Sequence, residues 1–153
     1  EDRMLCMWTQ EYFKDMPNAT LEHLMSALEH GNGERKLEHI VQELMEGTKQ
    51  IWIGTIEDKF VATVVTHIID YPSKKTCEVC YLGGESGSGV LDALGELSVI
   101  EEWAELQGCD DMQVYGRRGW LKALKKYDYS ERYTIVGKPL GNSQNNKGSK
   151  DET

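Results

Sequence analysis

The chain has 153 residues, a net charge of −9 and an apolar fraction of 39%. This length fits one domain with a buried core. The acidic net charge argues against non-specific nucleic-acid binding. No apolar run approaches the roughly 18 residues of a membrane helix. We therefore expect neither nucleic acid nor a membrane as a partner.

Two amphipathic helices are predicted in the first third of the chain. Apolar residues recur at helical spacing at Leu21, Leu24, Met25 and Leu28, and the pattern stops at the Gly-Asn-Gly of residues 31–33. A second helix, which ends at Gly47, places on one stripe Leu37, Ile40, Val41, Leu44 and Met45. The histidines of the three Leu-Glu-His triplets, His23, His30 and His39, are expected at exposed or boundary positions.

Three strands follow, at residues 50–56, 60–69 and 76–82. They are rich in β-branched residues, and short turns at 57–59 and 71–75 join them. Because these loops are too short for a crossover helix, the three strands should form an antiparallel meander.

The second half of the chain alternates helices with strands. A glycine-rich loop at 83–89 precedes one long helix over 90–107, whose inward face comprises Leu91, Leu94, Leu97, Ile100, Trp103 and Ala104. A strand at 111–115, a helix at 119–127 and a last strand at 133–136 complete the pattern. We expect the strands at 76–82 and 111–115 to be adjacent and parallel, and to diverge at their carboxyl ends. Residues 1–140 then form the domain, and the polar residues 141–153 a disordered tail.

This order predicts an α/β protein with a mixed sheet, an antiparallel meander followed by a β-α-β-α-β half. It resembles the GNAT (Gcn5-related N-acetyltransferase) fold, in which a strand, a glycine loop and a helix hold the pyrophosphate of coenzyme A. The family's loop, Gln/Arg-x-x-Gly-x-Gly/Ala, matches residues 84–89, but Gly84 replaces the amide or basic side chain. The resemblance implies acetyl-CoA as cofactor, with binding residues Leu82, Gly84, Ser86, Gly87, Ser88 and Gly89.

Several short motifs are similar to those of GNAT-like proteins encoded by tailed phages. They are Asp-Tyr-Pro at 70–72, Tyr-Leu-Gly-Gly at 81–84, Glu-Glu-Trp-Ala at 101–104, Gly-Cys-Asp at 108–110, Tyr-Gly-Arg-Arg-Gly-Trp at 115–120 and Lys-Pro-Leu at 138–140. This resemblance implies a phage or prophage source. The chain would then be located in the cytoplasm of the host cell or associated with the virion.

The catalytic residues depart from the GNAT pattern. The tyrosine that serves as general acid in the family aligns with Leu124, which leaves Tyr127 and Tyr129 as candidate proton donors. Glu78 is the candidate general base, with Glu85 and His67 as alternatives.

A basic segment, residues 115–140, carries a charge of +5, while the rest of the chain carries −14. It is either a solvated helix face or a site for a phosphorylated small molecule. Within it, Arg117 and Arg118 are candidates to clamp phosphate or carboxylate and are counted among the candidate cofactor-binding residues. Trp120 beside them is either core or a stacking partner.

A metal site is not expected. Cys77 and Cys80 form a CxxC, but they lie in a predicted strand, where residues three apart point to opposite faces. Two functions remain open. One is an N-acetyltransferase or acyl-CoA binder that acts on an unknown amine or protein. The other is an inactive GNAT-fold module that binds a virion or host protein. A homodimer is compatible with both.

Overall fold

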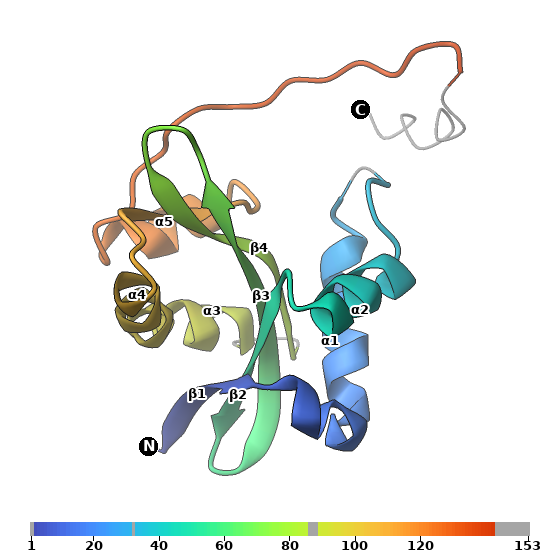
Figure 1. The fold of residues 1–153 in the computed structure, drawn as a ribbon, viewed down its shortest axis with the longest axis vertical. Coiled ribbons are helices and arrows are strands. Elements are labelled where there is room, and N and C mark those ends of the chain that lie inside the picture. The colour runs from blue at the N-terminus through green and yellow to red at the C-terminus, as the bar shows by residue number, and fades with distance from the viewer. Residues whose placement is uncertain (1, 32, 86–88, 143–153) are drawn as a thin grey trace.

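A computed structural model of the protein describes residues 2–31, 33–85 and 89–142. A five-stranded sheet in the order β1-β2-β3-β4-β5 forms its centre. Figure 1 shows helices α1 (Asn18–Leu28) and α2 (Leu37–Glu46) on one side of this sheet. Helices α3 (Gly89–Leu94), α4 (Leu97–Leu106) and α5 (Trp120–Lys125) lie on the other.

The first four strands are antiparallel neighbours: β1 (Arg3–Trp8), β2 (Gln50–Ile56), β3 (Lys59–Asp70) and β4 (Lys75–Gly84). Strand β5 (Asp111–Val114) pairs with β4 in parallel. The structure therefore confirms the predicted mixed sheet and its antiparallel meander. The turn between β2 and β3 has positive φ at Glu57 (50°) and Asp58 (69°), which suits a tight hairpin.

The expected divergence of β4 and β5 is also present. Their pairing runs from Thr76 opposite Asp111 to Val79 opposite Val114 and then ends. Strand β4 continues to Gly84, and no described strand pairs with it on that side. We call this opening, from Cys80 to Gly84 on β4 and after Val114 on β5, the fork.

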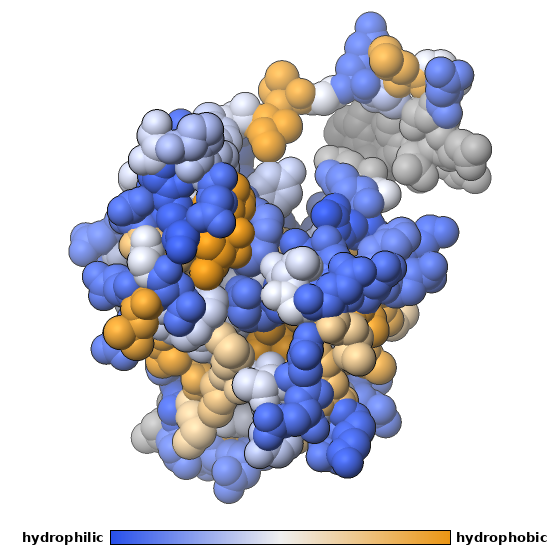
Figure 2. All heavy atoms as spheres, viewed as in Figure 1, coloured by the Kyte–Doolittle hydropathy of each residue, from blue (hydrophilic) through white to orange (hydrophobic). Residues whose placement is uncertain are grey.

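Apolar side chains form a core on each face of the sheet. One core joins β4 to α3, α4 and α5 through Val79, Leu82, Leu94, Ile100 and Leu124. The other packs α1 and α2 on the sheet through Leu24, Ile40, Leu44, Ile53 and Val65. The two cores fix both helical layers against the fork. Figure 2 shows the hydrophilic side chains that dominate the surface in this view.

Three sequence expectations concerning helices and faces are wrong, and one strand was missed. Strand β1 was not predicted, because its residues show no local strand pattern and their pairing with β2 decides their conformation. The expected helix over 90–107 is two helices, interrupted at Gly95 and Glu96, where glycine weakens the helix. His23 is buried. The helix faces are narrower than predicted, and solvent reaches Leu21, Met25, Val41, Met45 and Leu91.

The last predicted strand is also wrong. Residues 133–136 adopt no regular secondary structure, although their sequence, Tyr-Thr-Ile-Val, favours a strand. A strand requires a neighbour for its backbone hydrogen bonds, and no described segment pairs with these residues. Two segments remain. A short 3-10 helix (Gln10–Asp15) follows β1. Of the tail expected at 141–153, residues 143–153 lie outside the described residues.

Candidate active site at the fork between β4 and β5

A β-bulge lies at the base of the fork. Val65 pairs with Tyr81 and Thr66 pairs with Val79, so Cys80 has no partner on β3. The bulge places Cys80 and Tyr81 on the side of α1 and α2, while Leu82 points into the core on the side of α3. On its other side, β4 has no strand partner among the described residues beyond Val79, so an extended ligand can pair with its backbone there.

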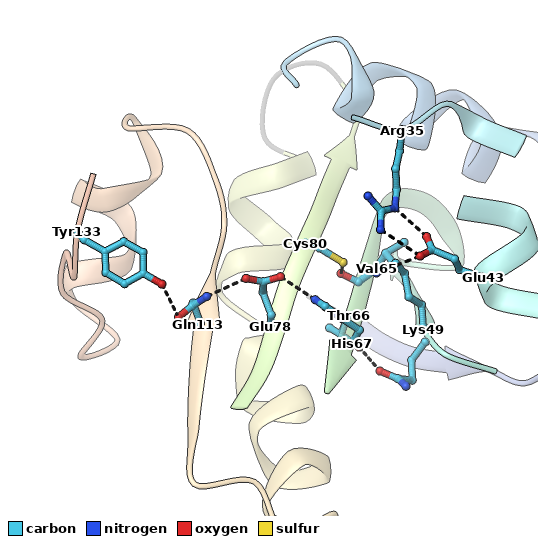
Figure 3. A network of polar contacts seen from close by, with 11 residues as sticks. Arg35, Glu43, Lys49, Val65, Thr66, His67, Glu78, Cys80, Gln113 and Tyr133 are labelled. Atoms are coloured by element: carbon cyan, nitrogen blue, oxygen red, sulfur yellow. Dashed lines mark hydrogen bonds and ion pairs between the residues drawn. The ribbon is translucent and has the colours of Figure 1, made fainter. Parts of the chain in front are cut away.

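Glu78 lies just before the bulge and joins three strands. Its Oε1 is 2.7 Å from Nε2 of His67 on β3, and its Oε2 accepts a 2.7 Å hydrogen bond from Nε2 of Gln113 on β5. Beyond this, the Tyr133 hydroxyl donates to Oε1 of Gln113 at 3.4 Å. Figure 3 shows this row of side chains crossing from β3 to the segment after α5.

The surroundings of Glu78 keep its carboxylate ionised. Burial raises the pKa of Glu78, but hydrogen bonds from His67 and Gln113 outweigh burial, so its pKa lies below the ordinary value. Since an ionised carboxylate can only accept hydrogen bonds, Nε2 of His67 is the donor of this contact.

A second polar cluster beside this pair was not predicted. Glu43 on α2 accepts hydrogen bonds of 3.0 and 3.2 Å from the guanidinium of Arg35. Its Oε2 lies 3.9 Å from Nζ of Lys49, which is buried. Figure 3 shows Lys49 close to His67 and Glu43. No motif in the sequence links these residues, because they meet only through the packing of α2 on the sheet.

The thiols near the fork are inert. Burial raises the pKa of Cys77 and that of Cys80 to about 12, so both stay protonated at neutral pH. Cys77 lies in the core under α4 and Cys80 on the side of α1 and α2, as their spacing predicted. Neither thiol is therefore suited to be a nucleophile. No group of three metal-ligating side chains occurs within residues 2–31, 33–85 and 89–142.

The two ends of the glycine loop are packed tightly together. A Cβ at Gly84 would lie 2.8 Å from the Val61 carbonyl oxygen and 3.0 Å from the Val90 nitrogen. A Cβ at Gly89 would lie closer still, 2.5 Å from the same Val61 oxygen. The basic side chain of the family motif therefore has no room at position 84. Ser86, Gly87 and Ser88 lie outside the described residues.

The carboxylate of Glu85 is held by helix α1. Its Oε2 is 2.9 Å from Nε2 of the buried His23, whose Nδ1 is 3.1 Å from the Thr63 hydroxyl. The backbone of His23 packs directly on Gly83, where any Cβ would collide with it. Glu85 therefore anchors the loop to α1, which makes it a poor candidate for the general base.

The two candidate proton donors lie on the face of the sheet that carries α3 to α5. The Tyr129 hydroxyl donates a 2.6 Å hydrogen bond to Oε2 of Glu101. Burial, with this contact, raises the pKa of Tyr129 well above its usual value. The Tyr127 hydroxyl lies beside Gly95, between α3 and α4. Neither hydroxyl bonds to Glu78, while Leu124 is core.

The two arginines after β5 differ in their surroundings. Arg117 stacks over the ring of Trp120, 5.1 Å from its centroid, and its Nη1 is 3.1 Å from Nε2 of His30. Trp120 itself packs on the core, so the core and the stacking interpretations both hold. Arg118 is exposed, and its side chain makes no hydrogen bond or ion pair with any described residue. Arg117 thereby connects the loop after β5 to the end of α1.

A cleft of about 340 Å³ lies near the start of α3 and the β2–β3 turn. Its lining carries three carboxylates, Glu57, Glu85 and Asp92, against the single cation Lys59. This charge does not favour an anion such as a pyrophosphate.

This architecture is shared with proteins of known structure. No protein-family model and no curated protein sequence matches the chain. Among solved structures, a predicted acetyltransferase with acetyl-CoA from Clostridium acetobutylicum is similar at a TM-score of 0.65 and 13% identity, over 94% of this chain and 99% of that one. Glucosamine-6-phosphate N-acetyltransferase from Arabidopsis thaliana is similar at a TM-score of 0.64 and 13% identity, over 92% of this chain and 99% of that one.

An aminoglycoside acetyltransferase from an uncultured soil metagenomic sample gives a TM-score of 0.63 and 13% identity, over 90% of this chain and 96% of that one. At these low sequence identities, the similarity shows a shared fold alone. The chain thus has the GNAT-like fold that its sequence predicts. Within the described part of the chain, no helix has the length and apolar character needed to cross a membrane.

Proposed function

We propose that this chain is an N-acetyltransferase that transfers the acetyl group of acetyl-CoA to an amine. One observation carries the proposal. An ionised, half-buried glutamate, Glu78, stands at the point where β4 and β5 separate, and His67 and Gln113 hold both of its oxygens. Among the described residues it is the carboxylate best placed to interact with an amine at the fork.

In this proposal the arm of acetyl-CoA that carries the thioester would lie along the free edge of β4 between Cys80 and Gly84. The amine nitrogen attacks the thioester carbonyl, a C–N bond forms, and the C–S bond breaks. Backbone N–H groups of β4 stabilise the oxyanion. The amine proton passes to the Glu78 carboxylate, which His67 and Gln113 hold in place, and from there to solvent. The thiolate takes its proton from water, since Tyr127 and Tyr129 lie on the opposite face of the sheet.

The test is release of free coenzyme A thiol from acetyl-CoA over a panel of amines. The panel contains an aminoglycoside, a hexosamine phosphate and a peptide with a free amino terminus. Turnover with at least one amine, abolished in Glu78→Gln, would support the proposal. An inert wild-type protein that binds acetyl-CoA would contradict catalysis but leave the binding site intact.

A second candidate function is a GNAT-fold module that binds a virion or host protein and no longer catalyses. Leu124 favours it, because this buried core residue occupies the position of the family's acid. The packed backbone at Gly84, which excludes a basic side chain, favours it as well. Thermal shift with coenzyme A separates the two functions: no shift at millimolar concentration would favour the binding module.

The phage source and the location in the host cytoplasm or the virion are also part of the proposal. They rest on the short motifs between residues 70 and 140, above all on Gly-Arg-Arg-Gly-Trp at 116–120. The Arg118 side chain in this motif is exposed and unpaired among the described residues, which suits contact with a phosphate of the cofactor or with a partner protein.

A further inference from the structure

The C-terminal arm, residues 133–140, is extended and buries almost none of its apolar side chains. Ile135 is 66% exposed, Val136 88% and Leu140 71%. No backbone hydrogen bond joins the arm to another described segment. Figure 1 shows it leaving the side of α5 and running past the end of the molecule. Exposed apolar side chains gathered in one short segment indicate a surface that another molecule covers.

The sheet has a matching open edge. Strand β5 is last in the strand order, and among the described strands it pairs with β4 alone. Alternate backbone N–H and C=O groups along its other side have no strand to bond. Such an edge accepts an additional strand from another chain.

The arm and the edge are chemically suited to each other. The segment Tyr-Thr-Ile-Val at 133–136 combines an aromatic residue with β-branched ones and has strong strand preference. At the root of the arm, Nη2 of Arg132 lies 2.8 Å from Oδ2 of Asp111, and the Tyr133 hydroxyl reaches Gln113. Both partners belong to β5. Beyond these side-chain contacts, the arm leaves its own β5 unpaired.

We propose that the arm of one chain adds as a strand to the β5 edge of a second copy, which returns its own arm in the same way. The occupant is a second copy because one chain carries both the open edge and the unpaired strand. A two-fold dimer therefore satisfies both at once with a self-complementary interface. The crossing arms bury Ile135, Val136 and Leu140, which are otherwise in water. This inference does not depend on the proposed acetyl transfer.

The first test is the molar mass of the full chain in solution, measured by light scattering after size exclusion. The wild type is expected at twice the mass of one chain. The double variant Ile135→Lys, Val136→Lys is expected at the mass of one chain, because charges replace the apolar contacts. Leu106→Lys is the matched control: Leu106 on α4 is 84% exposed and far from the arm in sequence, so its variant stays dimeric.

The second test locates the contact. Amide hydrogen exchange over residues 111–114 should be slower in the wild type than in the double variant, because added strand pairing protects edge amides. Both substituted side chains lie in water, so circular dichroism should show a folded double variant. A monomeric wild type, or a double variant that remains dimeric, would overturn the proposal. Equal exchange at 111–114 in the two proteins would overturn the assignment to β5.

Discussion

Replacement of Glu78 by glutamine tests the proposed chemistry most directly. The variant keeps the size of the side chain but removes its charge and puts an amide N–H₂ where one oxygen accepts a hydrogen bond. Both present contacts are 2.7 Å long. A hydrogen bond to a charged group contributes about 1.5–3 kcal/mol and a neutral one about 0.5–1.5. We therefore expect a loss of roughly 1–3 kcal/mol in the free energy of unfolding.

Glu78→Gln should lower the rate of acetyl transfer much more than it lowers the stability of the fold. General acid–base catalysis contributes about 10²–10⁴-fold to rate, so kcat for thiol release should fall by about that factor. Acetyl-CoA affinity should change little, because in the proposed reaction the Glu78 carboxylate contacts the amine and not acetyl-CoA. The stability difference from wild type should also shrink in acid. The folded-state pKa of Glu78 is lowered, so its contribution is present above the ordinary carboxyl pKa and is lost as pH falls through the folded one.

Glu101→Gln is the matched control for this experiment. Glu101 is a glutamate that accepts a 2.6 Å hydrogen bond from Tyr129, on the opposite face of the sheet. Its variant should lose stability and keep its turnover. A Glu78→Gln protein as active as wild type on every accepted amine would refute the assignment of Glu78. Equal loss of activity in both variants would point to stability as the cause.

Three further predictions concern stability. Gly84→Ala should lower the free energy of unfolding in urea by about 1–3 kcal/mol, because its Cβ would press on the Val61 carbonyl. Gly119→Ala is the control and should leave that free energy unchanged, because a Cβ there would meet nothing within 4 Å and φ is already helical, at −63°. Asp111 has a pKa lowered to about 2: burial raises it, but hydrogen bonds chiefly from Lys74 and Thr76 prevail. Its stabilisation should therefore disappear between about pH 4 and pH 2, and Asp111→Asn should lack that acid limb in thermal melts. A chain that ends at Leu140 should unfold within about 1 kcal/mol of the full chain, because the polar tail offers no apolar side chain to bury.

The parts of the fold that the sequence predicted are those with a local pattern. Strands β2, β3 and β4 alternate or concentrate β-branched residues, and α2 carries a stripe that ends, as predicted, at Gly47, where φ is 81°. Strand β1 has no such pattern. The prediction of a strand at 133–136 failed for the opposite reason: its local pattern is clear, but no described segment pairs with it.

The candidate site was less predictable because it depends on register. The bulge at Cys80 reverses the facing of every later residue of β4, and a sequence does not reveal which residue forms a bulge. Glu78 was predicted from its place on the third strand of the meander. Gln113 was not, because its role depends on the parallel pairing that sets it opposite Glu78. Lys49 and Arg35 come from loops whose positions only tertiary packing decides.

The state of Glu78 bears on the choice between an enzyme and an inactive scaffold. Removing a carboxylate from water costs free energy, and a charged pair recovers it only with good hydrogen bonds to both partners. Apolar side chains of similar size at positions 67 and 78 would hold β3 and β4 together at least as well. A scaffold has no need of the charge, yet this chain places an ionised carboxylate at the opening of the sheet and orients it with both His67 and Gln113. Stability alone does not account for that arrangement, whereas the proposed proton transfer from an amine at the fork would use it.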